Sequence, residues 1–271
     1  MRVTARGAAP AALAPALVLL LGLVLPACDA TRTTGGSGAA ARGPATASHP
    51  ETGEAVAASN VVLDAERASP TDIDLHWRGG GSDSSGHVLE FATDASGPYT
   101  VLRYLPAGVT SYRHPDLMPR TTFHYRLRAV LGPVSRPVSV ALPAGELTAS
   151  DEESGHDWLP ARTDPVRTVP GTPLRRTGAG APTAFKAVVK HANGILFTWT
   201  DHASDEEGFL LEARVRKDSG YAPVAVLDPD VNSTGLITLP TEKRGSYRVR
   251  AFTHGAPSNV VRLTTGDFAG Q

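Results

Sequence analysis

The sequence predicts an all-β protein made of two seven-stranded β-sandwiches joined by a proline-rich linker. The first observation is an internal repeat, because short segments of alternating apolar and polar residues around Trp77 recur in the same order around Trp199. The second is composition: 22 prolines, 27 glycines and few aromatic residues in 271 residues argue against one large core. The third is the regular occurrence of turn-forming residues between these segments, which is typical of antiparallel sandwiches.

The N-terminal segment has the features of an export signal. Two arginines precede an almost uncharged apolar run over residues 8–25, and the only cysteine, Cys28, follows it. Residues 25–28, Leu-Pro-Ala-Cys, resemble the bacterial lipobox, which implies removal of residues 1–27 and a diacylglycerol thioether on Cys28. The alternative is one membrane-spanning helix with an incidental cysteine, because the run is close to the ~20 residues that such a helix needs. Lipidation would leave the mature chain without a free thiol or a disulfide.

A flexible tether is predicted over residues 28–58. This segment has almost no large apolar side chain, so burial cannot offset the entropy lost on ordering. A coil of roughly 30 residues has an end-to-end distance of about 30 Å, which would lift a domain clear of the lipid headgroups.

The first sandwich is predicted over residues 59–144. Ile73, Leu75 and Trp77 alternate with polar residues, which assigns one face of their strand to the core. The last strand, within residues 137–142, is expected to close this sandwich at an edge.

The second sandwich is predicted over residues 182–266, with residues 260–263 as its last strand and residues 267–271 as a tail. The intervening residues 145–181 contain several prolines and no sustained periodicity. They are expected to form a semi-stiff linker that spaces the two domains and prevents them from packing face to face.

Two segments of the second copy carry a family resemblance: WTDHASDEEGFLLEA at residues 199–213 and YRVRAF at residues 247–252. They resemble the fibronectin type III domain, especially its bacterial branch, which implies an immunoglobulin-like fold with a core tryptophan on the second strand. Domains of this family resemble adhesion and spacer modules. Neither copy has the tyrosine that the family usually places before its sixth strand.

The resemblance also implies structural roles for charged residues that the two copies share. The third and sixth strands are neighbours in the family's topology, so Glu90 is expected to face Arg126 or Arg128, and Glu212 to face Arg248 or Arg250. The alternative is a site for phosphate or an acidic ligand, but each arginine pair comes with its own carboxylate. The predicted structural residues are Trp77, Trp199, Glu90, Glu212, Arg126, Arg128, Arg248 and Arg250.

The most acidic loop within a domain is a weak candidate for a metal site. Its carboxylates are Asp201, Asp205, Glu206 and Glu207. Several oxygen ligands in one turn suit a hard cation, but the spacing lacks the Asp-x-Asp-x-Asp-Gly order of a dedicated calcium loop. Capping of backbone amides within the turn is the favoured interpretation, so neither a metal nor another cofactor is predicted.

No catalytic motif occurs in the sequence. The histidines are scattered, Gly-x-Ser-x-Gly is absent, and no glycine-rich phosphate loop is present. His87 occupies the position of Phe209 in the second copy and is expected to be a partly buried core residue. The formal net charge of -1 gives no support to nucleic-acid binding.

The sequence therefore predicts a non-catalytic, lipid-anchored cell-envelope protein that displays two domains for binding to a protein or a glycan. The alternative is an accessory subunit that positions a partner enzyme or an envelope complex. The membrane would be contacted through the N-terminal lipid, and both the periplasmic face and the cell surface are open as locations.

Overall fold

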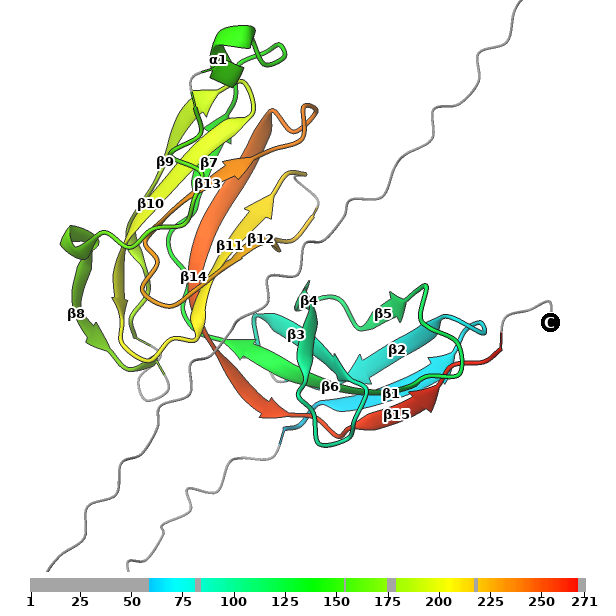
Figure 1. Cartoon of the computed structure of the whole chain (residues 1–271). Coiled ribbons are helices and arrows are strands. Elements are labelled where there is room, and N and C mark those ends of the chain that lie inside the picture. The colour runs from blue at the N-terminus through cyan, green and yellow to red at the C-terminus, as the bar shows by residue number, and fades with distance from the viewer. Residues whose placement is uncertain (1–58, 81–83, 154, 175–178, 217–218, 268–271) are drawn as a thin grey trace, which may run out of the picture. The chain divides into compact units, whose positions relative to one another are not determined.

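The computed structural model describes residues 59–267, with gaps at 81–83, 154, 175–178 and 217–218. The fold of this part is all-β and comprises two β-sandwiches (Figure 1). The predicted signal peptide, Cys28 and the tether over residues 28–58 lie outside the described residues. Within the described ranges, no helix has the length and apolar character needed to cross a bilayer.

The first sandwich has two sheets whose strands come from the first repeat. One sheet has the order β1-β2-β5, and β3 pairs with both β4 and β6 in the other. Ile73, Leu75 and Trp77 are buried and alternate with more exposed residues, so the predicted core face is confirmed. The strands are β1 (Val62–Arg67), β2 (Ile73–Arg78), β3 (Gly86–Ala92), β4 (Thr100–Pro106), β5 (Ser111–His114) and β6 (Thr122–Leu131).

The second sandwich repeats this plan. One sheet pairs β10 with β9 and β13, and the other pairs β11 with β12 and β14. Trp199 and Phe197 are fully buried on β10, and the ring of Phe197 stacks on that of Phe185 at 5.4 Å. The strands are β9 (Thr183–His191), β10 (Gly194–Ala203), β11 (Gly208–Arg214), β12 (Ala222–Leu227), β13 (Ser233–Ile237) and β14 (Arg244–Pro257).

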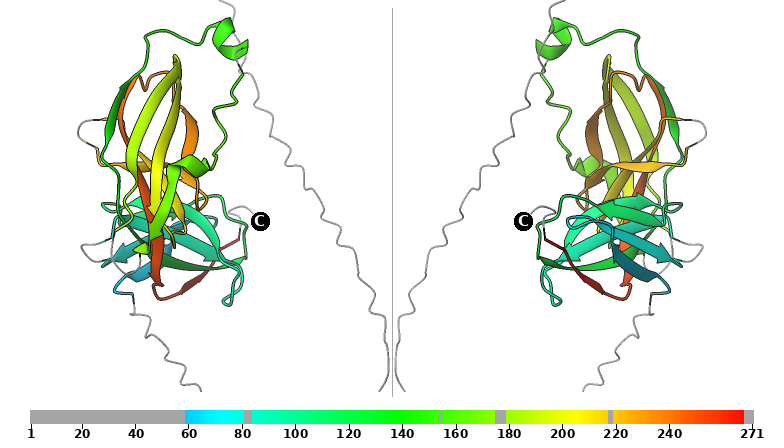
Figure 2. Two further views of the ribbon diagram at one scale, coloured as in Figure 1. Left: turned by 90° about the vertical axis from the view of Figure 1, so that its left-hand side faces the viewer. Right: turned by 90° about the vertical axis from the view of Figure 1, so that its right-hand side faces the viewer.

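The two closing strands are exchanged between the sandwiches, which corrects the predicted domain boundaries. β7 (Val138–Ala141) was expected to close the first sandwich but pairs with β14 of the second. β15 (Val261–Thr264) was expected to close the second sandwich but pairs with β6 of the first. Figures 1 and 2 show β15, in red, lying with the blue and cyan strands of the first repeat. Residues 59–144 and 182–266 are therefore not two independently closed domains.

The exchange depends on two segments that run past each other in extended form. The end of β14 pairs antiparallel with the end of β6, where Thr253 lies opposite Leu131. Pro133 and Pro137 favour extended backbone after β6 over a turn that reverses the chain. Gly132 has a φ of 130°, and a Cβ there would lie 2.2 Å from the carbonyl oxygen of Ala251. Only glycine permits this close approach of the two backbones.

The segment over residues 145–181 is structured in part, which corrects the prediction of a spacer. It contains α1 (Ala149–Glu153), a 3₁₀ turn η1 (Pro165–Arg167) and β8 (Thr168–Thr172). β8 pairs with β10 in parallel, and Trp158 packs edge-on against His191 at 5.3 Å. Trp158 therefore rests on the second sandwich.

The two sandwiches also share a small apolar cluster, contrary to the expectation that they would be spaced apart. Val88 on β3, Val130 on β6, Leu210 on β11 and Phe252 on β14 are buried together, with Tyr104 against them. These side chains face away from the two main cores. β3 and β11 are largely buried on both faces, because one face packs in its own sandwich and the other, with Val88 and Leu210, lies at this junction.

Candidate functional site

The predicted ion pair of the first copy is present in the structure. Glu90 lies opposite Arg126 in the pairing of β3 with β6, and its Oε2 accepts a hydrogen bond from Nε of Arg126 at 2.5 Å. The same guanidinium lies 4.0 Å from the ring centroid of Tyr99, a cation–π contact that sequence reasoning missed. Arg128 does not join this pair; its Nε donates to the carbonyl oxygen of Gly255 at 2.9 Å.

The second copy has a tighter version of the same arrangement. Glu212 accepts hydrogen bonds from Nε of Arg248 at 2.5 Å and from Nε of Arg250 at 3.2 Å. Arg248 lies 4.0 Å from the ring centroid of Tyr221, the counterpart of Tyr99. Arg250 also donates to the carbonyl oxygen of Gly132 at 2.6 Å, so it connects the second sandwich to the crossing segment. Each of these arginines is engaged by the protein itself, which supports the structural interpretation over an anion site.

A hydrogen-bonded chain of three side chains holds the junction. His254 on the crossing strand β14 lies with Nδ1 2.5 Å from Oε2 of Glu207 and with Nε2 3.2 Å from the hydroxyl of Tyr104. A carboxylate only accepts, so Nδ1 carries the hydrogen, and a neutral ring then accepts from the tyrosine through Nε2. Burial, with the nearby carboxylates of Glu207 and Glu90, raises the pKa of Tyr104 to about 12, which keeps its hydroxyl protonated.

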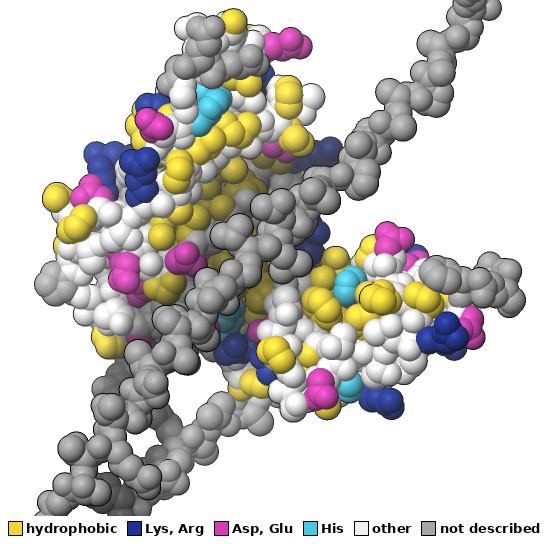
Figure 3. Space-filling model, in the orientation of Figure 1, with side chains coloured by type: hydrophobic (Ala, Val, Ile, Leu, Met, Phe, Trp, Pro, Cys, Tyr) yellow, Lys and Arg dark blue, Asp and Glu magenta, His cyan; other side chains and the backbone are white. Residues whose placement is uncertain are grey.

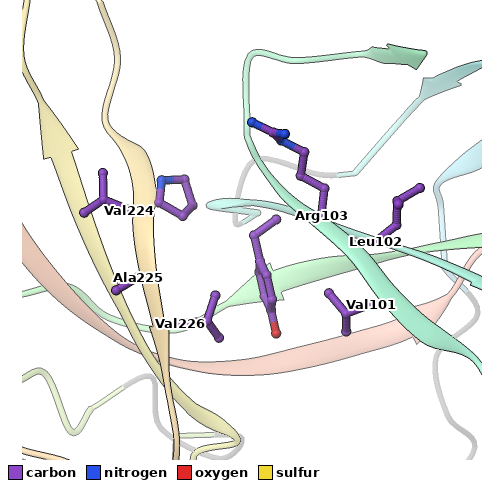
Figure 4. A pocket seen from close by; sticks show the side chains of 8 residues that line it. Val101, Leu102, Arg103, Val224, Ala225 and Val226 are labelled. Carbon is purple, nitrogen blue, oxygen red and sulfur yellow. The ribbon is translucent and has the colours of Figure 1, made fainter. Parts of the chain in front are cut away.

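Two free strand edges border an open groove. Among the described strands, β4 pairs only with β3, and β12 pairs only with β11. They are the end strands of one eight-stranded sheet, and the groove of about 520 Å³ lies between them (Figure 4). The groove is lined by Val101, Leu102, Arg103, Tyr104, Pro223, Val224, Ala225 and Val226.

The apolar surface extends from this groove over the open side of the second sandwich. Val215, Ile237 and Leu239 are exposed and line a second hollow, which Val224 also borders. Figure 3 shows hydrophobic side chains gathered over the region of β11 and β12. We call the exposed residues Val101, Val215, Val224, Val226, Ile237 and Leu239 the apolar band. Sequence reasoning missed this band, because each of its members also fits the alternation of an ordinary strand or lies in a short turn.

The acidic turn divides into two parts in the structure. Glu207 is bound to His254, and Oδ1 of Asp205 accepts from the backbone amide of Leu174 at 2.5 Å. Asp201 and Glu206 instead approach Asp230, a residue that the sequence prediction did not include. These carboxylates cap backbone amides as predicted: Asp201 accepts from the amide of Ala203 at 2.9 Å, and Glu206 from that of Asp230 at 3.2 Å. Capping uses only one oxygen of each.

Burial sets the electrostatics of this cluster. It raises the pKa of both Asp201 and Glu206, and the carboxylate of Asp230 adds to the rise at each. Burial acts to raise the pKa of Glu207 as well, but the hydrogen bonds from the amide and ring of His254, together with the charges of His254 and Arg128, lower it overall. Within one turn, the surroundings therefore shift the pKa of Glu206 and that of its neighbour Glu207 in opposite directions.

His87 is buried on β3, with its ring 6.1 Å from that of Trp77. Both ring nitrogens lack a hydrogen-bond partner among the described residues, and burial lowers the pKa of the imidazole. In the second copy Phe209 packs against Trp199, with the ring centroids 5.6 Å apart. His87 and Phe209 therefore occupy corresponding core positions.

Comparisons with known proteins give structural likeness without a sequence family. No family model and no curated protein matches the chain. A fibronectin type III-like protein from Clostridium thermocellum matches with a TM-score of 0.24 and 23% identity, over 26% of this chain and 71% of the other. A computationally redesigned β-sandwich protein matches with a TM-score of 0.22 and 23% identity, over 25% and 71%. A two-domain fibronectin type III segment of chicken tenascin matches with a TM-score of 0.23 and 15% identity, over 75% and 97%.

The assignment to the all-β class rests on the chain's own strands and their pairing. The sandwiches are structurally similar to fibronectin type III domains.

Proposed function

We propose that this protein is a non-catalytic, lipid-anchored component of the bacterial cell envelope that binds an extended segment of a partner polypeptide between its two sandwiches. The anchor would be the lipid on Cys28, and residues 28–58 would serve as the spacer. Sandwich domains of this type are consistent with binding and adhesion modules, and the particular partner is inferred from the surface of this chain.

The groove between β4 and β12 is the observation that carries the proposal. An edge strand presents unpaired backbone amides and carbonyls, and an added strand satisfies them. Here two such edges border one apolar hollow. A partner strand could pair with one edge and place alternate apolar side chains against the valines of the other. Contiguous apolar surface of this kind marks interaction sites on proteins.

The composition of the groove favours a polypeptide over a glycan. Val101, Val224 and Val226 are exposed aliphatic residues, and Tyr104 supplies the single aromatic ring of the lining. Sugar rings bind to flat aromatic faces with many polar contacts, whereas valines suit the apolar side chains of a peptide strand. The junction supports the groove, because Tyr104 is held in place by His254.

The proposal is tested by charging the groove. Val224 and Val226 are 44% and 50% exposed, so Val224→Lys/Val226→Lys should fold normally while removing the apolar surface. Val188→Lys is the matched control, because Val188 is 51% exposed on β9 and lies outside the groove. A peptide library displayed on phage is selected against the full-length chain in detergent.

The expected result is enrichment of peptides with aliphatic residues at alternate positions. They should bind the wild type and Val188→Lys equally and the double variant at least tenfold more weakly. Equal binding to all three proteins, or enrichment of none, would contradict the proposal. Photo-crosslinking from position 226 in cells then separates the two roles: one stoichiometric envelope protein supports an accessory subunit, and adducts with proteins of other cells support adhesion.

A further inference from the structure

We propose that Asp201, Glu206 and Asp230 form a calcium-binding site in the second sandwich. The site is separate from the groove and is independent of the proposed function. It includes only part of the acidic turn that the sequence singled out, and it adds a residue from a different loop.

Three segments of the chain bring these carboxylates together. Asp201 lies near the end of β10, Glu206 lies in the turn between β10 and β11, and Asp230 lies in the loop between β12 and β13. One oxygen from each residue lies within 4.8 Å of the oxygens of the other two. Asp230 adopts a left-handed backbone with a φ of 62°, a conformation that a non-glycine residue rarely adopts. Its amide donates to Oε1 of Glu206, which fixes the loop against the turn.

Two buried oxygens in this cluster point to a missing ligand. Asp201 is 1% exposed and Glu206 is 8% exposed. Oδ2 of Asp201 and Oε2 of Glu206 have no hydrogen-bond partner among the residues that the structure describes. None of the ion pairs found in the described part of the chain involves Asp201, Glu206 or Asp230. Buried carboxylates are normally paired with a cation or hydrogen-bonded at both oxygens, and a bound metal ion would supply the missing partner.

The first copy of the repeat shows that the fold does not require these carboxylates. Trp77 and Trp199 are 122 positions apart, and the same offset relates the neighbouring strands. It places Gly79, Ser84 and Gly108 at the positions of Asp201, Glu206 and Asp230. The first sandwich forms the corresponding strands with no carboxylate at any of the three positions. The three carboxylates are therefore specific to the second sandwich, and the sandwich fold itself does not require them.

The donor set selects calcium among the common divalent cations. All three donors are carboxylate oxygens, which hard cations prefer, whereas zinc favours nitrogen and sulfur. The donor oxygens lie within 4.8 Å of one another, a span that one ion with Ca–O distances of about 2.4 Å can bridge. Magnesium demands near-ideal octahedral geometry at about 2.0–2.1 Å and is usually held by one or two carboxylates, so a set of three protein carboxylates suits it less well. Water would complete the 6–8 ligands that calcium takes, since Asp230 is exposed.

Calcium binding would fix the turn that supports the junction. Glu207 follows Glu206 directly, its amide donates to the carbonyl oxygen of Phe252, and its side chain holds His254. With three protein ligands and an exposed side, the site should have a Kd of about 10⁻⁴–10⁻³ M, the range of extracellular calcium modules.

The test measures thermal unfolding of the full-length chain in detergent, after treatment with EDTA and with calcium chloride then added. Asp201→Asn removes a buried ligand, and Asp230→Asn removes an exposed one without disturbing the core. Asp228→Asn is the matched control, because Asp228 is exposed in the same loop and is not part of the cluster. Magnesium chloride and zinc chloride are tested in parallel, and isothermal titration calorimetry gives the Kd.

The expected result is a rise in the wild-type Tm with calcium that Asp228→Asn retains. Asp230→Asn should bind calcium at least about tenfold more weakly, and Asp201→Asn should not respond to it. In EDTA, Asp201→Asn should be at least as stable as the wild type, because it removes a buried negative charge; this separates loss of a ligand from loss of the fold. No calcium response up to about 10 mM, an equal response in Asp201→Asn, or a larger response to magnesium or zinc would overturn the proposal.

Discussion

Ser135 and Ser258 make the same two hydrogen bonds, each with the sixth strand of the other repeat's sandwich. The hydroxyl of Ser135 accepts from the amide of Val249 at 3.1 Å, and the hydroxyl of Ser258 accepts from the amide of Leu127 at 2.9 Å. The amide of each serine donates to the carbonyl oxygen of the same residue at 2.8 Å. The exchange of closing strands is therefore reciprocal down to individual hydrogen bonds, and it connects the two sandwiches twice.

Removing either hydroxyl should destabilise the protein. Ser135→Ala and Ser258→Ala each leave a buried amide without its acceptor, and each is expected to lower the free energy of unfolding by about 1–2 kcal/mol. Ser139→Ala, at an exposed position of β7, should change it by less than about 0.5 kcal/mol. Urea denaturation measures all three. A loss at Ser135 or Ser258 no larger than at Ser139 would show that these hydrogen bonds do not support the exchange.

The two cross-strand carboxylates should differ in their contribution to stability. Glu212 is buried against two arginines, one of which is itself buried, so Glu212→Gln is expected to cost about 3–5 kcal/mol. Glu90 faces only Arg126, which is 27% exposed, so Glu90→Gln should cost less, about 1.5–3 kcal/mol. Guanidinium chloride would screen such pairs, so urea is the denaturant of choice. The account fails here if Glu90→Gln costs as much as Glu212→Gln.

His87 should make the protein sensitive to acid. Burial lowers the pKa of His87 from its ordinary value of 6.5, so the folded chain binds fewer protons than the unfolded chain just below that pH. The contribution of His87 to stability is then fully present above about pH 6.5 and is lost as the pH falls below it.

His87→Phe, which copies Phe209 of the second sandwich, should remove this dependence. At neutral pH the change should stay within about 1.5 kcal/mol, because the substitution is close to volume-conserving. Unfolding free energies measured from pH 7 to pH 5 should diverge, with the variant gaining relative to the wild type. Parallel curves for the two proteins would mean that His87 does not titrate on unfolding.

Lipid attachment should depend on Cys28 alone. Cys28→Ser removes the only thiol of the chain, so labelling with a radioactive fatty acid should be lost and the precursor should stay uncleaved at this point. Membrane fractionation and mass spectrometry of the N-terminus measure both effects. Normal maturation of Cys28→Ser would exclude the lipobox interpretation. Protease treatment of intact cells that carry the wild-type protein distinguishes the periplasmic face from the cell surface.

The strands and their core faces could be predicted from the sequence, because alternation at residues such as Ile73, Leu75 and Trp77 is local information. The exchange could not be predicted in this way. β7 and β15 both follow a serine, both alternate, and both fit beside a Tyr-x-x-x-Ala strand, so either could close either sandwich. The crossing segments determine which sandwich each strand closes. There Gly132 permits the two backbones to approach closely, and this approach leaves no periodic pattern in the sequence.

The candidate sites divide in the same way. The ion pairs of Glu90 and Glu212 followed from the family resemblance, which implied that the third and sixth strands are neighbours. Asp230 was missed because it lies 24 positions after Glu206 and joins it only through folding. The groove was missed because its two walls come from different copies of the repeat, and no alternation within one strand indicates what lies opposite its free edge.

The exchange of closing strands is the central claim, because it locks the sandwiches together and brings β4 and β12 to opposite sides of one groove. A cysteine pair tests it most directly. The hydroxyl oxygens of Thr122 on β6 and Thr264 on β15 lie 2.8 Å apart, so Thr122→Cys/Thr264→Cys in a Cys28→Ser background should form a disulfide within one chain. Without exchange, Thr122 would instead lie beside Ala141 of β7, and Thr122→Cys/Ala141→Cys is the matched alternative.

Mild oxidation, followed by non-reducing electrophoresis and mass spectrometry of the linked peptides, shows which pair of positions forms a disulfide. The account predicts a monomer with a disulfide between positions 122 and 264 and no disulfide between positions 122 and 141. A monomer that links 122 to 141 but not to 264 would contradict it.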